Sequence, residues 1–168
     1  MNNKNKHFPK KGRVYIPELF EAIGKVRSKK ERVEILHEYA RRDEPHCKTI
    51  RAVIECIFHP AVVFDLPEGT PPYTKGDYPD YNFANTTLFK EVRRVKYFCN
   101  CPAMIKNKIK REAVFIQTLE ALHPKEAEIF LAMKDKQLPK YRGVTEALFR
   151  EAFPAWMPAE EDKAKKDD

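Results

Sequence analysis

Hydrophobic positions recur every three or four residues over most of the chain, which is the spacing of one face of a helix. Proline or a capping residue opens most of these segments, as Pro17, Ser28 and Pro124 do. The alternation of apolar and polar residues that is typical of a strand is limited to residues 13–16 and 61–66. Both stretches are equally typical of extended chain that packs on helices. The pattern therefore predicts an all-α fold, a compact bundle of about six or seven helices. The predicted helices cover about residues 17–27, 29–42, 45–59, 86–99, 103–122, 124–136 and 144–153.

One long insert, residues 60–85, interrupts the helical pattern. Its central part, DLPEGTPPYTKGDYPDYNF, holds four prolines, two glycines and three tyrosines. Prolines stiffen an extended segment, and tyrosine rings offer a large contact area with few rotatable bonds. Two interpretations stay open: a clamp that packs over the protein's own core, or a surface that grips a partner. In the second interpretation the anchoring residues are Tyr73, Tyr78, Tyr81 and the nearby Trp156.

Charge and length divide the chain into three parts. Residues 1–13 carry five bases and no acid and are expected to form a flexible basic arm, while residues 159–168 form a charged tail expected to be disordered. Between them, residues 14–158 suit a single helical domain that contains the insert. No apolar window approaches a membrane span, and the N-terminus lacks the apolar region of a secretory signal, so we expect no membrane association and an intracellular protein.

The basic surplus is concentrated between residues 86 and 111. Eight bases and one acid give this stretch a charge of +7 (8 − 1), which equals the net charge of the whole 168-residue chain. On the predicted helix of residues 86–99, basic residues lie opposite the apolar positions, where they can follow a phosphate backbone while Tyr97 stacks on a base. The alternative is an ordinary solvated helix face, because no base-reading motif accompanies the charge. The predicted nucleic-acid interface consists of Lys90, Arg93, Arg94, Tyr97, Lys106, Lys110 and Arg111.

Cysteine and histidine residues offer a weak metal-binding pattern. Cys56, His59, Cys99 and Cys101 form one C-x-x-H and one C-x-C rather than two C-x-x-C pairs. Because Cys56 and Cys99 also fit apolar helix faces, we expect neither a metal nor another cofactor, although zinc stays an open alternative. No glycine-rich phosphate loop, G-x-S-x-G or H-E-x-x-H motif is present, so no catalytic residue is assigned and a non-enzymatic protein is expected.

Three strings resemble a known group of proteins. They are LPEGTPPY (66–73), VFIQTLEALHPKEAEIFLAMKDKQL (114–138) and EALFREAFPAWMP (146–158). The resemblance covers about residues 17–158 and is to a family of uncharacterised small proteins of large contractile-tailed bacteriophages, including a group labelled as heat-shock-linked transcription modulators. The cysteine and histidine constellation is not part of that family's pattern.

This resemblance implies a phage protein that acts in the cytoplasm of the infected bacterial host. Together with the charge pattern it predicts an accessory protein that binds nucleic acid or a host transcription or replication protein. The alternative is a protein-interaction module that grips a host or virion protein through the insert. The partner's identity and the oligomeric state stay open.

Overall fold

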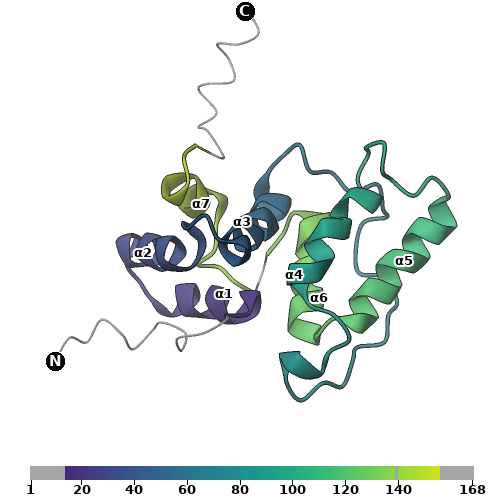
Figure 1. The fold of residues 1–168 in the computed structure, drawn as a ribbon, viewed down its shortest axis with the longest axis horizontal. Coiled ribbons are helices and arrows are strands. Elements are labelled where there is room, and N and C mark those ends of the chain that lie inside the picture. Colours follow the sequence, from purple (N-terminus) through teal and green to yellow (C-terminus); the bar gives the residue numbers. More distant parts are fainter. Residues whose placement is uncertain (1–13, 139, 156–168) are drawn as a thin grey trace, which may run out of the picture.

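A computed structural model describes residues 14–138 and 140–155 of the chain, and within them the fold is entirely helical, as predicted (Figure 1). The predicted basic arm (1–13), the charged tail (159–168) and Trp156 lie outside the described residues. The α-helices are α1 (Ile16–Lys25), α2 (Lys29–Ala40), α3 (Pro45–Phe58), α4 (Leu88–Glu91), α5 (Lys108–Ala121), α6 (Pro124–Asp135) and α7 (Glu146–Ala152), and the 3-10 helices are η2 (Tyr81–Phe83) and η3 (Val92–Tyr97). None of the described helices is long and apolar enough to cross a bilayer.

Helices α3 and α6 lie at the centre of the bundle (Figure 1). Helix α3 contacts α2, α4, η3 and α6, while α6 also contacts α1 and α5. Most residues of α6 are buried, whichever side of the helix they occupy. Such all-round burial is typical of a helix enclosed by other helices. It explains why α6 has no continuous polar face in the sequence.

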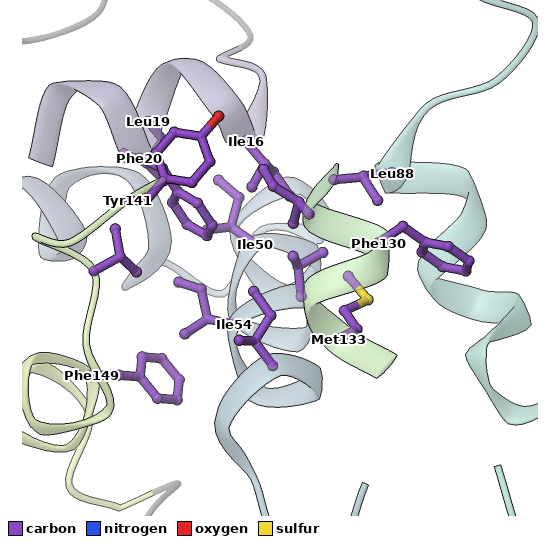
Figure 2. Close-up of a cluster of buried hydrophobic side chains, with 14 of the residues drawn as sticks. Ile16, Leu19, Phe20, Ile50, Ile54, Leu88, Phe130, Met133, Tyr141 and Phe149 are labelled. Carbon is purple, nitrogen blue, oxygen red and sulfur yellow. The ribbon is translucent and has the colours of Figure 1, made fainter. Parts of the chain in front are cut away.

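The core runs through the whole described chain as one cluster of hydrophobic side chains. Figure 2 shows part of it, where Ile50 and Ile54 of α3 lie near Phe130 and Met133 of α6. All four side chains are fully buried. Burying a side chain of this size contributes roughly 1.5–3 kcal/mol to the free energy of unfolding. Contacts between α3 and α6 therefore join the two groups of helices visible in Figure 1.

Two helices differ from their predicted bounds by more than two residues. The predicted fourth helix begins as α4 but continues from Val92 as the 3-10 helix η3. The fifth begins at residue 108 rather than 103, because the chain turns back after η3 and the amide of Ile105 donates to the carbonyl of Tyr97 at 3.0 Å. Asn107 then opens α5, since its side chain accepts from the amide of Lys110 at 2.9 Å. Of the two strand-like segments, neither residues 14–16 nor residues 61–66 form a strand, and the second contributes only a single bridge between Phe64 and Cys99.

The insert folds back onto α5. Between residues 65 and 80 the chain forms neither helix nor strand. The hydroxyl of Tyr78 donates to the carbonyl of Glu120 at 3.2 Å, and the amide of Thr74 donates to the Glu120 carboxylate at 3.0 Å. A Cβ atom at position 76 would collide with the Tyr78 ring, so Gly76 allows this ring to lie against its own loop. These contacts fix the insert as part of the molecule's own packing.

Four cationic side chains, three of them buried and Lys136 half-buried, donate hydrogen bonds to backbone carbonyl groups. Arg51 donates to the carbonyls of Ala40 and Arg42 and so closes the end of α2. Lys134 reaches the carbonyls of residues 67 and 69, each at 2.8 Å. Lys136 donates to the carbonyls of residues 56 and 59, and Arg111 donates to those of residues 65 and 105. Because these cations satisfy backbone acceptors, they do not contribute to the positive charge on the exposed surface.

Candidate nucleic-acid interface

The basic surface begins with a three-residue repeat in α4 and η3, where residues 89–97 read FKE, VRR and VKY. A 3-10 helix has three residues per turn, so side chains three positions apart lie above one another. The first residue of each triplet is buried or half-buried, and the second is exposed. We call this exposed row, Lys90, Arg93 and Lys96, the basic ridge.

An aromatic cluster anchors the inward side of η3. Phe98 continues the inward row and is fully buried. Its ring centroid lies 5.3 Å from that of Phe115 in α5 and 6.1 Å from that of Phe130 in α6. The carbonyl of Phe98 also accepts from the amide of Asp65 at 2.8 Å. Because η3 is fixed to the core along this row, the ridge side chains project away from it.

The three ridge cations form no ion pair with any carboxylate in residues 14–138 and 140–155. Other surface lysines do pair: Lys48 lies 2.9 Å from Asp43, and Lys125 lies 2.8 Å from Glu21. The only acid near the ridge in sequence, Glu91, is buried and accepts from the Thr86 hydroxyl at 2.7 Å. The positive charge of the ridge is therefore not neutralised by its neighbours.

A second group of cations, Lys106, Lys108 and Lys110, stands at the start of α5 and is called here the lysine turn. All three are exposed, and Ile109 between them is 80% exposed. The first turn of α5 contains no acid. Cations at a helix N-terminus are disfavoured by the helix dipole, by roughly 0.3–1 kcal/mol each at low salt. The turn adjoins the end of η3 through the bond between residues 105 and 97, so ridge and lysine turn form neighbouring surfaces.

Arg111 corrects the predicted interface. It is only 4% exposed. Its Nε and Nη2 atoms donate to the carbonyl and carboxylate of Asp65 at 2.8 and 2.9 Å, and its Nη1 donates to the carbonyl of Ile105 at 2.8 Å. A guanidinium held on three sides in this way cannot reach a phosphate without breaking the fold.

Arg94 and Tyr97, the third residues of their triplets, differ from the ridge. The Arg94 Nη1 atom lies 3.7 Å from a Glu91 carboxylate oxygen, so part of its charge is compensated. Tyr97 is half-buried, and the Lys96 ammonium lies 5.6 Å from the centre of its ring. Tyr97 is therefore less exposed than the ridge cations, whereas Arg94 is exposed but paired with Glu91.

Tyr81 corrects the partner-binding interpretation of the insert. It is 8% exposed, and its ring lies 4.6 Å from that of Tyr15 and 4.3 Å from that of His123. Tyr73 and Tyr78 are half-buried against the protein itself. The rings therefore serve internal packing first, and Tyr81 offers no surface to a partner.

The cysteines and histidine considered for zinc all lie in the described residues, and Cys56, Cys99 and Cys101 line one groove without His59. Within residues 14–138 and 140–155, no group of three or more His, Cys, Asp or Glu side chains has an arrangement that could hold a metal ion. The His59 ring accepts from the amide of Ala61 at 3.1 Å, and the Cys101 thiol donates to the carbonyl of Lys96 at 3.1 Å. Burial raises the pKa of the Cys56 thiol to about 12, so this thiol is neutral near pH 7.

Comparison with protein families matches residues 19–140 to a family model described as a family of unknown function, DUF6433. The chain belongs to this family. No curated protein and no solved structure matches it. The matched range includes the insert, the basic ridge and the lysine turn, and it ends before α7. The DUF6433 description carries no activity or ligand, so the chemistry of the surface itself has to indicate the function.

Two cations of this surface, Lys96 and Lys108, are absent from the residues predicted from the sequence. With the α-helical period of 3.6 residues used for residues 86–99, Lys96 lies about 120° from Lys90 around the helix, so the three cations do not form one row. A period of three places all three in one row and also selects Phe89, Val92 and Val95 as the inward side. The triplet repeat is therefore the feature of the sequence from which the ridge can be found.

Proposed function

We propose that this DUF6433 protein binds nucleic acid through the basic ridge and the lysine turn. One observation carries the proposal: six exposed cations between residues 90 and 110 have no carboxylate partner in the described chain. These are Lys90, Arg93, Lys96, Lys106, Lys108 and Lys110. Arg93 and Lys96 are separated by about 6 Å along the 3-10 helix η3, and Lys90 precedes them in α4, so one polyanion chain can contact all three. Neutralising phosphates releases counterions and so drives binding.

The expected binding is independent of base sequence. Flexible lysine and arginine side chains without an accompanying base-reading motif contact phosphates rather than base edges. Tyr97, half-buried beside the ridge, is the aromatic ring placed to stack on an unpaired base. The proposal is therefore of a binding protein, not of an enzyme.

The resemblance to proteins of contractile-tailed phages supplies the setting of the proposal. In that setting the protein is a phage accessory protein in the cytoplasm of the infected bacterium, and it acts on nucleic acid or on a host transcription or replication protein. The alternative, a module that grips a host or virion protein through the insert, has weaker support because Tyr81 is buried in ring contacts with Tyr15 and His123.

The test compares two triple variants with the same loss of charge. Replacing Lys90, Arg93 and Lys96 by glutamine lowers the formal net charge from +7 to +4 (7 − 3), and so does replacing Lys29, Lys48 and Lys125, which are paired with carboxylates. Fluorescence anisotropy with a labelled DNA duplex and a labelled RNA strand is expected to show a loss of about tenfold or more for the ridge variant only. Equal losses in both variants would contradict the proposal, because they would attribute the affinity to net charge alone.

A further inference from the structure

A groove of about 560 Å³ lies beside the basic ridge. Val62 and Val63 line it together with Val92 and Val95 of η3. The two segments are tied together where the amide of Asp65 donates to the carbonyl of Phe98 at 2.8 Å. The groove is therefore part of the fold as it stands and needs no rearrangement to form.

Most of the groove lining is apolar, and Arg93, Lys96 and Asn100 are its charged and amide side chains. Cys56 and Cys99 contribute to it, and burial raises the pKa of both thiols, so that both are neutral near pH 7. A neutral buried thiol behaves as a small hydrophobic group. Val63 is 59% exposed, which is unusual for a large aliphatic side chain of this protein. Exposed aliphatic groups around a hollow mark a surface that gains free energy when it is covered.

Cations stand where the groove meets solvent. Arg93 and Lys96 both line it, and neither forms an ion pair with a carboxylate of residues 14–138 or 140–155. An apolar centre with a charged rim is the usual composition of a protein-recognition surface, and the sign of the rim selects the partner. No aromatic side chain of the described chain lines the groove, so it lacks the platform on which nucleobases stack.

We propose that this groove binds a peptide segment of a partner protein in which an aliphatic or aromatic side chain is flanked by aspartate or glutamate. The apolar side chain fills the space between Val63 and Val95, and the carboxylates pair with Arg93 and Lys96. The same two cations belong to the basic ridge, so an acidic peptide and a nucleic acid exclude one another. This second consequence rests on the proposed function, whereas the peptide site itself does not.

The peptide site is tested without nucleic acid. The probe is a short fluorescein-labelled peptide with two leucines flanked by glutamates, and the comparison peptide carries serines in place of the leucines. We expect the leucine peptide to bind the full chain about tenfold more tightly, and Val63→Ser to remove most of that difference. Ile109→Ser, which changes an even more exposed aliphatic residue (80% against 59% for Val63) outside the groove lining, is the control and should leave the difference between the two peptides unchanged. Equal binding of the two peptides, or an equal effect of the two serine variants, would overturn the inference.

Competition separates this inference from the proposed function. Adding the unlabelled leucine peptide should displace a labelled DNA duplex from the wild-type protein but not from Val63→Ser at the same peptide concentration. If the protein binds peptide but no DNA, the groove assignment stands and the proposed function fails. If Val63→Ser weakens DNA binding rather than peptide binding, nucleobases occupy the groove and the inference fails. A monomer–dimer equilibrium abolished by Val63→Ser in sedimentation would assign the groove to a second copy and would equally overturn it.

Discussion

The guanidinium of Arg111 is buried in the interior, while the side chain of its neighbour Lys110 is exposed at the start of α5. The difference arises from partners distant in sequence, the carbonyl and carboxylate of Asp65, which lie 46 positions away. A hydrogen bond from a charged donor to a buried acceptor contributes more than a neutral one, and removing the donor leaves the acceptor unsatisfied. Arg111 thus stabilises the fold that presents the ridge, rather than contacting the ligand.

The first prediction concerns this residue. Arg111→Met should lower the free energy of unfolding by about 2–3 kcal/mol, because it leaves the carbonyls of Asp65 and Ile105 without their donor. Urea denaturation gives that difference, and anisotropy measured well below the midpoint should show DNA affinity close to that of the wild type. A variant with full stability and no affinity would place Arg111 in the binding site instead.

Glu126 is buried in a different way. It is fully buried in α6, and one carboxylate oxygen accepts from the amide of Leu88 at 2.6 Å, at the first residue of α4. The other oxygen has no hydrogen-bond partner among the described residues. Burial raises the pKa of Glu126 to about 7, although the bond from Leu88 acts in the opposite direction. The folded protein therefore favours the protonated carboxyl up to near-neutral pH.

The second prediction follows from the sign of this shift. A raised pKa stabilises the fold at low pH, and that contribution is lost as the pH rises from the ordinary value of 4.5 through about 7. Glu126→Gln keeps an acceptor for the Leu88 amide and carries no charge, so it should be more stable than the wild type by about 3 kcal/mol at pH 8 and nearly equal to it at pH 4. Urea midpoints at the two pH values measure the difference. A constant difference between the proteins across this range would contradict the assignment.

At the scale of elements, η3 and the start of α5 both depart from ordinary helix rules. A six-residue 3-10 helix is longer than most, and it is held by burial of its inward row against Phe115 and Phe130. The lysine turn places cations where the helix dipole disfavours them, with no acid in the first turn of α5 to compensate. Local costs of this kind, concentrated on one surface, are typical of sites that bind a ligand.

The third prediction is that the cations of the lysine turn lower stability and raise affinity for nucleic acid. Replacing Lys106, Lys108 and Lys110 by glutamine should raise the free energy of unfolding by about 0.5–1 kcal/mol at low salt, because it removes charge opposed to the dipole of α5. The same variant should bind DNA more weakly. Thermal unfolding and anisotropy on one preparation test both halves. A variant that loses stability as well as affinity would show that the lysines support the fold.

The sequence predicts most elements of this fold because their start signals are local. Ser28, Pro45 and Pro124 begin their helices within one or two residues of the predicted positions. Residues 92–97 are not predicted by local signals, because their 3-10 conformation depends on tertiary packing of the inward row. The start of α5 is not predicted either, because it depends on a turn in which residue 105 bonds to residue 97. For the candidate site, the concentration of charge is visible in the sequence, but the burial of Arg111 and Tyr81 depends on partners from other segments.

At the scale of the whole molecule, the proposed nucleic-acid binding depends on where positive charge remains unpaired with carboxylates. Many cations elsewhere are paired with carboxylates or hold buried carbonyls, as Lys125 and Lys134 do. The ridge and the lysine turn keep six exposed cations without a carboxylate partner in the described chain. Net charge alone would give weak, diffuse attraction, whereas a localised surface makes a countable number of phosphate contacts.

The salt dependence of binding tests that claim most directly. The association constant for a DNA duplex is measured by anisotropy between low and moderate salt and plotted as log K against log salt concentration. Four to six phosphate contacts predict a slope of about −3.5 to −5.5, and glutamine at the three ridge positions should reduce its magnitude by about 2–3. A flat response, or a slope unchanged in the ridge variant, would contradict the account.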